Sequence, residues 1–162
     1  MRTQKLIPGL ALAAVLAVPV ALAAAPPAGA TARAATCRVE LDYIDSNNVD
    51  ESDGVDEIRV NLGGIMYPAG NNWVNMWGGA RAYTASFGSP SATISSSGSA
   101  LYSVREVTPP WVAGGTTLGT ITAQGSLCAT LSTGQTVGLT KTITGTDDTF
   151  YSYFIRLVMT GL

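Results

Sequence analysis

The chain has 162 residues, of which 46% are hydrophobic and 12% are charged, and its formal net charge at pH 7 is −2. Because there is no basic excess, the composition argues against nucleic acid and against anionic membrane surfaces as partners. The sequence contains no histidine, which excludes Ser-His-Asp and Cys-His catalysis and any zinc site that uses imidazole.

The first 34 residues have the pattern of a secretory signal peptide. Arg2 and Lys5 precede an apolar run at 10–25, and Ala-x-Ala sites follow that end at Ala30 and Ala34. Pro19 interrupts the apolar run and no basic cluster follows it, so a retained membrane anchor is the weaker interpretation. We therefore expect cleavage near Ala30 or Ala34, a secreted product without a stable membrane anchor, and one domain over residues 35–162.

Alternating apolar and polar residues predict the first two strands of this domain. Residues 37–43 alternate, with Val39 and Leu41 on one face, and residues 57–62 do the same with Arg59 on the outer face. If these two strands pair, Arg59 lies opposite Glu40 or Asp42, as an exposed ion pair.

Further strands are predicted at 101–107, 116–123, 137–143 and 150–159, with turn-forming Gly, Pro and Asn residues between them. The last of these is the most apolar and is expected to be central. No segment after residue 35 has helical periodicity over ten or more residues. Short, regularly spaced strands of this kind predict an all-β fold, a single antiparallel β-sandwich of about seven to nine strands.

The two cysteines, Cys37 and Cys128, are expected to form a disulfide, because an exported protein folds under oxidising conditions and a lone pair usually bridges there.

An acidic loop between the first two predicted strands is the main candidate site. Calcium prefers six to eight oxygen ligands, and the loop offers carboxylates that repel one another unless a cation or water separates them. The spacing departs from the EF-hand pattern, because Val49 stands at its fifth position and Asp50 at its glycine position. A solvated loop that keeps the protein soluble is the alternative to a calcium site. The candidate ligands are Asp45, Asp50, Asp53, Asp56 and Glu57.

Two other functions are open at the level of sequence. Trp73, Trp77 and Trp111 could stack on sugar rings in a carbohydrate-binding or cell-envelope-associated module, or they could cover the core. A rigid loop at 107–115 could inhibit secreted proteases. Acid pairs such as Glu57 with Glu106 or Asp148 would serve a glycosidase only if their loops converged on a cleft, and we expect no enzymatic activity.

Several motifs together carry a family resemblance. They are a Cys-bearing first strand, the run G-V-D-E-I-R-V at 54–60 after an acidic loop, G-G-T-T-L-G at 114–119, and an aromatic last strand. In this layout, residues 37–159 resemble a group of small secreted bacterial β-sandwich proteins of unknown function. That group has a G-S-D-E-[IV]-Y-L-x-V-x-G signature and is loosely similar to C2 domains.

The resemblance implies a β-sandwich, and the chain departs from the family pattern at two positions. Arg59 stands where the signature has an aromatic residue, and Val107-Thr108 follows Glu106 where the family has an aspartate. In a calcium-binding C2 domain, carboxylates from two loops share the ions, and the second loop here would contribute at most Glu106. We expect a secreted, non-catalytic protein whose acidic loop is a candidate Ca²⁺ site, with a cell-envelope polymer or an extracellular protein as the candidate partner.

Overall fold

The computed structural model describes residues 32–162, except for the side chains of residues 111–113. The expected signal peptide at 1–34 lies outside this range except for its last three residues. Among the described residues, no helix has both the length and the hydropathy that a membrane span requires.

Ten strands make up most of the described chain, joined by tight turns and two helices of four residues. The strands are β1 (Thr36–Asn48), β2 (Val55–Leu62), β3 (Ile65–Tyr67), β4 (Val74–Trp77), β5 (Arg81–Tyr83), β6 (Ser91–Ser95), β7 (Ser99–Thr108), β8 (Trp111–Gln124), β9 (Thr136–Thr146) and β10 (Phe150–Gly161). The helices are η1 (Thr84–Phe87), a 3₁₀ turn, and α1 (Gly125–Cys128).

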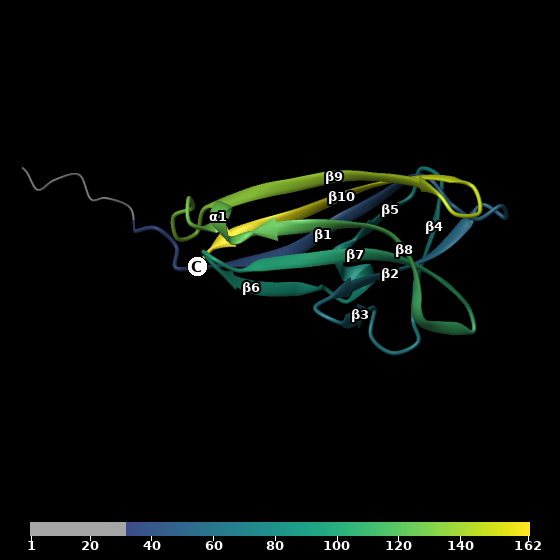
Figure 1. The fold of residues 1–162 in the computed structure, drawn as a ribbon, viewed down its shortest axis with the longest axis horizontal. Helices are drawn as coiled ribbons and strands as arrows, with labels where there is room; N and C mark the ends of the chain where they lie inside the picture. The colour runs from purple at the N-terminus through teal and green to yellow at the C-terminus, as the bar shows by residue number, and fades with distance from the viewer. Residues whose placement is uncertain (1–31) are drawn as a thin grey trace, which may run out of the picture. The chain divides into compact units, whose positions relative to one another are not determined.

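The strands form two antiparallel sheets of five strands each. Figure 1 shows the strands of the domain with their labels. One sheet has the order β5-β1-β10-β9, with β6 also on β1, and the other has the order β3-β2-β7-β8, with β4 also on β2. The expected all-β fold with antiparallel sheets is confirmed, with one strand more than the upper estimate. The apolar strand β10 is central, because β1 and β9 flank it on either side.

The expected pairing of the first two strands is wrong. β1 pairs with β10, β5 and β6, whereas β2 lies in the other sheet and pairs with β3, β4 and β7. Arg59 therefore lies opposite Arg105, and it is buried, with its Nη2 donating to the carbonyls of Pro68 (2.6 Å) and Gly70 (2.8 Å). Two strands that pair in a hairpin and two strands that lie in different sheets show the same alternation of apolar and polar residues. The sequence pattern alone therefore could not tell these two arrangements apart.

Inward-facing residues of the two sheets make one core. Leu41, Ile155 and Leu157 from the first sheet are buried in the same cluster as Ile58 and Val60 from the second. The phenol of Tyr102 crosses the core and donates to the carbonyl of Val39 over 2.8 Å, so the hydroxyl of this buried ring is satisfied.

The expected disulfide is confirmed. Cys37 on β1 is bonded to Cys128 at the end of α1, with their Cα atoms 5.7 Å apart and a sequence separation of 91.

The segment at 107–115 is not an irregular loop. It belongs to a β7–β8 hairpin in which Thr108 pairs with Trp111 across Pro109 and Pro110. The pairing shifts register between Val104 and Arg105 and again between Glu106 and Thr108.

Removing the disulfide by Cys37→Ser with Cys128→Ser should lower the free energy of unfolding by about 4–5 kcal/mol, because a closed loop of this length restricts the unfolded chain. Urea denaturation of the double variant against the oxidised wild type measures this difference. A loss below about 1 kcal/mol would show that the hydrogen-bonded sheets alone set the stability.

Candidate functional site

The loop between β1 and β2 is organised by the carboxylate of Asp56, which is fully buried at the start of β2. Its Oδ2 accepts the backbone N–H of Asp50 and its Oδ1 accepts that of Glu51, each over 2.9 Å. The phenol of Tyr153 on β10 also donates to Oδ2. Both oxygens of Asp56 therefore serve to hold the loop against the sandwich.

A second buried carboxylate, Asp50, ties in the turn between β9 and β10. Its Oδ1 accepts the backbone N–H groups of Asp147, Asp148 and Thr149 over 3.1, 3.2 and 3.1 Å. The N–H of Thr149 also donates to the Asp50 carbonyl over 2.8 Å. Asp50 thus acts as an anion held by backbone donors, which connects the two loops at this end of the sandwich.

Three glutamates converge beside these anchored loops. Carboxylate oxygens of Glu51 in the β1–β2 loop, Glu57 on β2 and Glu106 on β7 all lie within 4.8 Å of one another. Glu106 is only 7% exposed, and Thr108 Oγ1 stands 3.5 Å from its Oε1, at the long limit for a hydrogen bond. We call these three residues the glutamate cluster.

The cluster is electrostatically strained. Burial raises the pKa of Glu106 to about 7, and its hydrogen bond with Glu51 and the charges of Glu51, Asp56 and Glu57 act in the same direction. Burial also raises the pKa of Glu57, with the charges of Glu51, Asp53 and Asp56 adding to the effect. In the described chain, every side chain that shifts these two pKa values is acidic. A proton or a cation is therefore needed to relieve the cluster.

A polar pocket of about 440 Å³ opens beside the cluster. Glu51 and Glu106 line it together with residues of both loops, among them Asp53 and Asp148. Asp53 Oδ1 accepts the backbone N–H of Val55 over 3.0 Å, and Asp148 Oδ2 accepts that of Ser52 over 3.3 Å. Both residues therefore line the pocket while one oxygen of each accepts a backbone N–H group in or next to the β1–β2 loop.

The structure separates the five ligands predicted from sequence. Asp53 and Glu57 lie at the pocket and the cluster, Asp50 lines the pocket but points its Oδ1 at backbone amides, and Asp56 is buried beneath. Asp45 lies elsewhere, because β1 extends to Asn48 and carries it within the strand.

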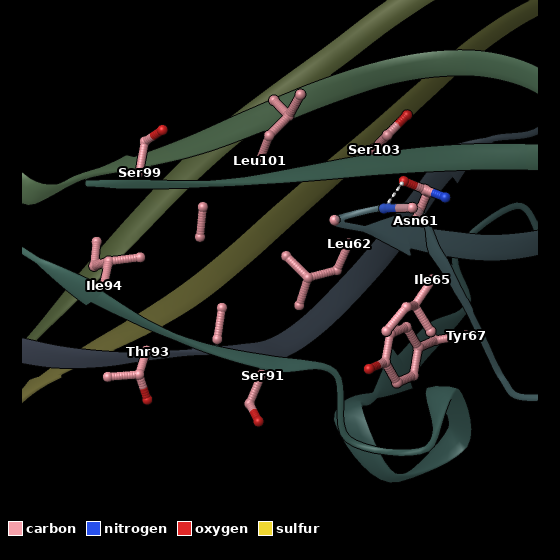
Figure 2. Close-up of a pocket in the computed structure, with 14 residues that line it drawn as sticks. Asn61, Leu62, Ile65, Tyr67, Ser91, Thr93, Ile94, Ser99, Leu101 and Ser103 are labelled. Carbon is pink, nitrogen blue, oxygen red and sulfur yellow. Dashed lines mark hydrogen bonds between the residues drawn. The ribbon is translucent and has the colours of Figure 1, made fainter.

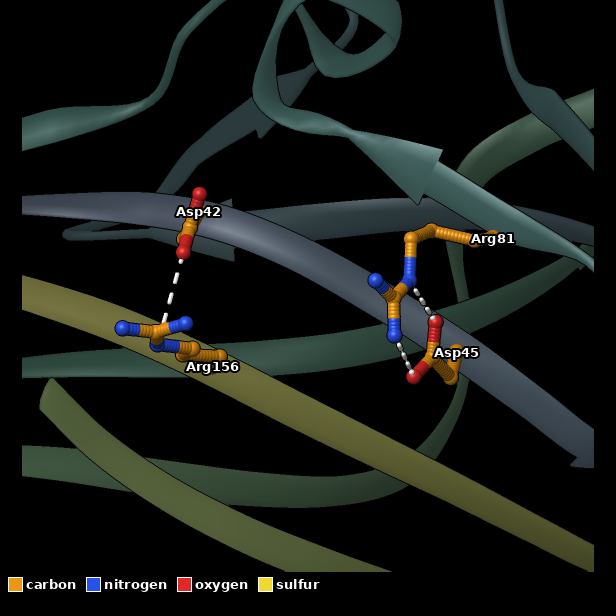
Figure 3. A network of polar contacts seen from close by, with 4 residues as sticks. All are labelled: Asp42, Asp45, Arg81 and Arg156. Carbon is orange, nitrogen blue, oxygen red and sulfur yellow. Dashed lines mark hydrogen bonds and ion pairs between the residues drawn. The ribbon is translucent and has the colours of Figure 1, made fainter.

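Asp45 instead belongs to an ion-paired surface on the first sheet (Figure 3). It binds the guanidinium of Arg81 through both oxygens, at 2.5 and 2.7 Å, and Asp42 lies 3.4 Å from Arg156. The guanidinium of Arg81 also stacks 3.9 Å from the ring centroid of Tyr43. These residues satisfy one another and are separate from the acidic pocket.

Two of the three tryptophans proposed for sugar stacking are exposed in the structure. Trp73 is 37% exposed and donates its Nε1–H to Asn75 Oδ1 over 2.8 Å, and Trp77 on β4 is 57% exposed. The side chain of Trp111 lies outside the part of the chain that the structure describes.

Glu51 and Glu106 were not among the ligands chosen from sequence. Glu106 had a readable signal, because it follows Tyr102 and Val104 in the inward phase of β7 and so places a carboxylate at a core position. Glu51 had none, since its position depends on the backbone hydrogen bonds that Asp56 accepts.

No protein-family model matches the chain, and no curated protein matches it significantly. Among solved structures, the chain is similar to the first C2 domain of plant extended synaptotagmin 1, with 9% sequence identity and a TM-score of 0.46. The alignment covers 79% of this chain and 94% of that domain. What the chain binds is therefore argued from its own side chains.

Asp56→Asn should lower the free energy of unfolding by about 1.5–3 kcal/mol, because an amide nitrogen would face a backbone or phenol donor in a buried site. Asp53→Asn makes the same charge change in the same loop at an exposed position and should cost less than about 1 kcal/mol. Urea denaturation in chelator compares the two. Equal losses would contradict the structural role of Asp56.

Glu106 should also make stability depend on pH in the presence of chelator. The pKa of Glu106 rises from 4.5 to about 7 on folding. Its contribution to the free energy of unfolding is therefore fully present below about pH 4.5 and is lost as the pH rises through about 7. Glu106→Gln should remove this loss and become more stable relative to wild type between about pH 5 and about pH 8.

Glu40→Gln on β1 is the control, because it removes a glutamate charge on the other sheet. A flat difference from wild type for Glu106→Gln would show that Glu106 titrates as an ordinary surface acid.

Proposed function

We propose that this chain is an exported, non-catalytic β-sandwich protein that binds calcium through Glu51, Glu57 and Glu106. The observation that carries the proposal is the convergence of these three carboxylates, one of them nine-tenths buried, among groups of the same charge. Folding holds these carboxylates together although they repel one another. A bound cation would replace this repulsion with attraction.

The spacing of the cluster suits calcium. Calcium holds its oxygens at 2.3–2.6 Å, so two ligands of one ion lie at most about 5.2 Å apart, and the cluster falls within that limit. Calcium also needs six or more oxygens in total. The nearby pocket supplies further carboxylates from Asp53 and Asp148 and a hydroxyl from Thr108, and water would complete the shell.

A non-catalytic role is supported by the sequence, because the absence of histidine removes the Ser-His-Asp and Cys-His mechanisms. Export is supported by the signal-peptide pattern and by the disulfide between Cys37 and Cys128.

Glycan binding is a second candidate, and one observation favours it. Trp73, Asn75 and Trp77 are all exposed on β4 and the residue before it, while Met76 between them is fully buried. Alternation along a strand therefore places two indole rings and an amide on one outer face, about 13 Å from end to end. Such a face suits a neutral cell-envelope polysaccharide, with the rings stacking on sugars.

Calcium should raise the free energy of unfolding by about 2.7 kcal/mol when its free concentration is a hundred times the dissociation constant, since it binds the folded state alone. Thermal melting in chelator and in millimolar calcium measures the shift. Glu51→Gln with Glu106→Gln should abolish it, because two of the three converging ligands are lost.

Asp45→Asn is the matched control, since it also removes an acidic charge but lies in the Arg81 ion pair. It should keep the full calcium response. If calcium leaves the melting temperature of the wild type unchanged, or if Asp45→Asn loses the response as well, the glutamate cluster is not a calcium site.

For the second candidate, soluble glucans or peptidoglycan fragments should change tryptophan fluorescence, and Trp77→Ala should lose both the change and the binding. Leu101→Ala, which also removes an exposed apolar side chain but on β7, should bind as the wild type does. If the fluorescence stays constant with every polymer, Trp73 and Trp77 do not bind sugars and only cover the edge of the sheet.

A further inference from the structure

A groove runs between β6 and β7, and none of the residues of the glutamate cluster line it. The two strands belong to different sheets and diverge after the turn at 96–98, and the β2–β3 turn closes the far end (Figure 2). The groove has a volume of about 530 Å³, within the range of ordinary ligand sites. We call it the β6–β7 groove and define it by residues 91–94, 99–101, 103, 61–65 and 67.

The groove follows strand edges rather than a sheet face. Side chains alternate between faces along a strand, yet consecutive residues of both β6 and β7 line the groove, at 91–94 and 99–101. A cavity that touches both faces of a strand must pass along its backbone edge. Among the described strands, β6 pairs only with β1, so its other edge has no strand partner.

The register of β6 tells which backbone groups that edge presents. The N–H of Leu41 donates to the carbonyl of Pro90 over 3.2 Å, immediately before the paired stretch in which Glu40 lies opposite Ser91. Hydrogen-bonded and non-hydrogen-bonded pairs alternate in an antiparallel ladder. Ala92 and Ile94 therefore bond to β1, whereas the N–H and C=O groups of Ser91 and Thr93 point away from it.

The side chains of the groove are uncharged throughout. Leu62, Ile94 and Ala100 are buried at its floor, while Ile65 and Leu101 are 59% and 51% exposed at its rim. Serine, threonine and asparagine side chains and the phenol of Tyr67 supply the polar groups (Figure 2). A charged ligand would lose its hydration here without gaining an ion pair, so the lining selects a neutral occupant.

We propose that the β6–β7 groove binds an extended, uncharged polypeptide segment from another protein, which adds as a strand to the edge of β6. The outward backbone groups of Ser91 and Thr93 would hydrogen-bond to its main chain, and the apolar floor would take every second side chain. β6 has five residues, which gives a contact length of about 16 Å and room for a segment of about five residues.

A linear, random heptapeptide display library tests the proposal directly. The full chain is the bait, and each round is counter-selected against Thr93→Pro, which removes one outward N–H without touching the ladder to β1. Selected peptides should be uncharged, rich in β-branched residues and without proline at the centre. A synthetic peptide from the selection should bind Thr93→Pro about tenfold more weakly than wild type.

Thr93→Val is the matched control, because it keeps the N–H and removes only the hydroxyl, and it should bind as the wild type does. Ile65→Lys and Leu101→Lys place a charge on the exposed rim and should weaken binding even if Thr93→Pro fails to fold. Backbone amide NMR shifts on adding the peptide should be largest at 91–95.

Four outcomes would overturn the proposal. The first two are a selection that enriches no peptide over Thr93→Pro and a selection that enriches charged or proline-rich peptides. The third is NMR shifts at 91–95 on adding neutral oligosaccharides such as cellohexaose in place of peptide. The fourth is a wild-type dimer that the Thr93→Pro substitution dissociates. The third would assign the groove to a glycan and the fourth to a second copy of this chain. None of them depends on calcium, so failure here leaves the glutamate cluster untouched.

Discussion

The buried carboxylate of Asp56 holds one end of this sandwich together. It lies at the start of β2, accepts two backbone amides of the β1–β2 loop and receives the phenol of Tyr153 from β10, in the opposite sheet. Asp50, positioned through that contact, then binds the amides of the β9–β10 turn. Two carboxylates satisfied by neutral donors thus fix two loops.

The anchoring of these loops creates the unsatisfied cluster beside them. With the backbone of Glu51 fixed, its carboxylate meets Glu57 and Glu106, and the side chains that raise the pKa values of Glu57 and Glu106 are all acidic. Asp50 and Asp56 tolerate burial because N–H and O–H groups point at their oxygens, whereas Glu106 has one distant hydroxyl and an acidic neighbour. The contrast between satisfied and unsatisfied carboxylates locates the candidate site.

Much of the fold was readable from sequence, because alternation, turn residues and a lone cysteine pair each report locally on strands and on a bridge. The pairing partner of each strand was not readable. The alternation in β1 and β2 predicts a hairpin, but the two strands lie in different sheets. The acidic loop was located correctly as a segment. The placement of its side chains was not readable, because Asp45 continues β1 and Asp56 faces inward, which register and hydrogen bonding decide and composition does not.

Proton and calcium should compete for the same carboxylates, and this competition is the centre of the account. Carbon-13 NMR of the glutamate side-chain carboxyls, followed as a function of pH, measures it most directly. In chelator, Glu106 should titrate near its elevated pKa of about 7, and saturating calcium should move that titration to well below the ordinary value of a glutamate. A Glu106 resonance that titrates at the ordinary value, with or without calcium, would contradict the account.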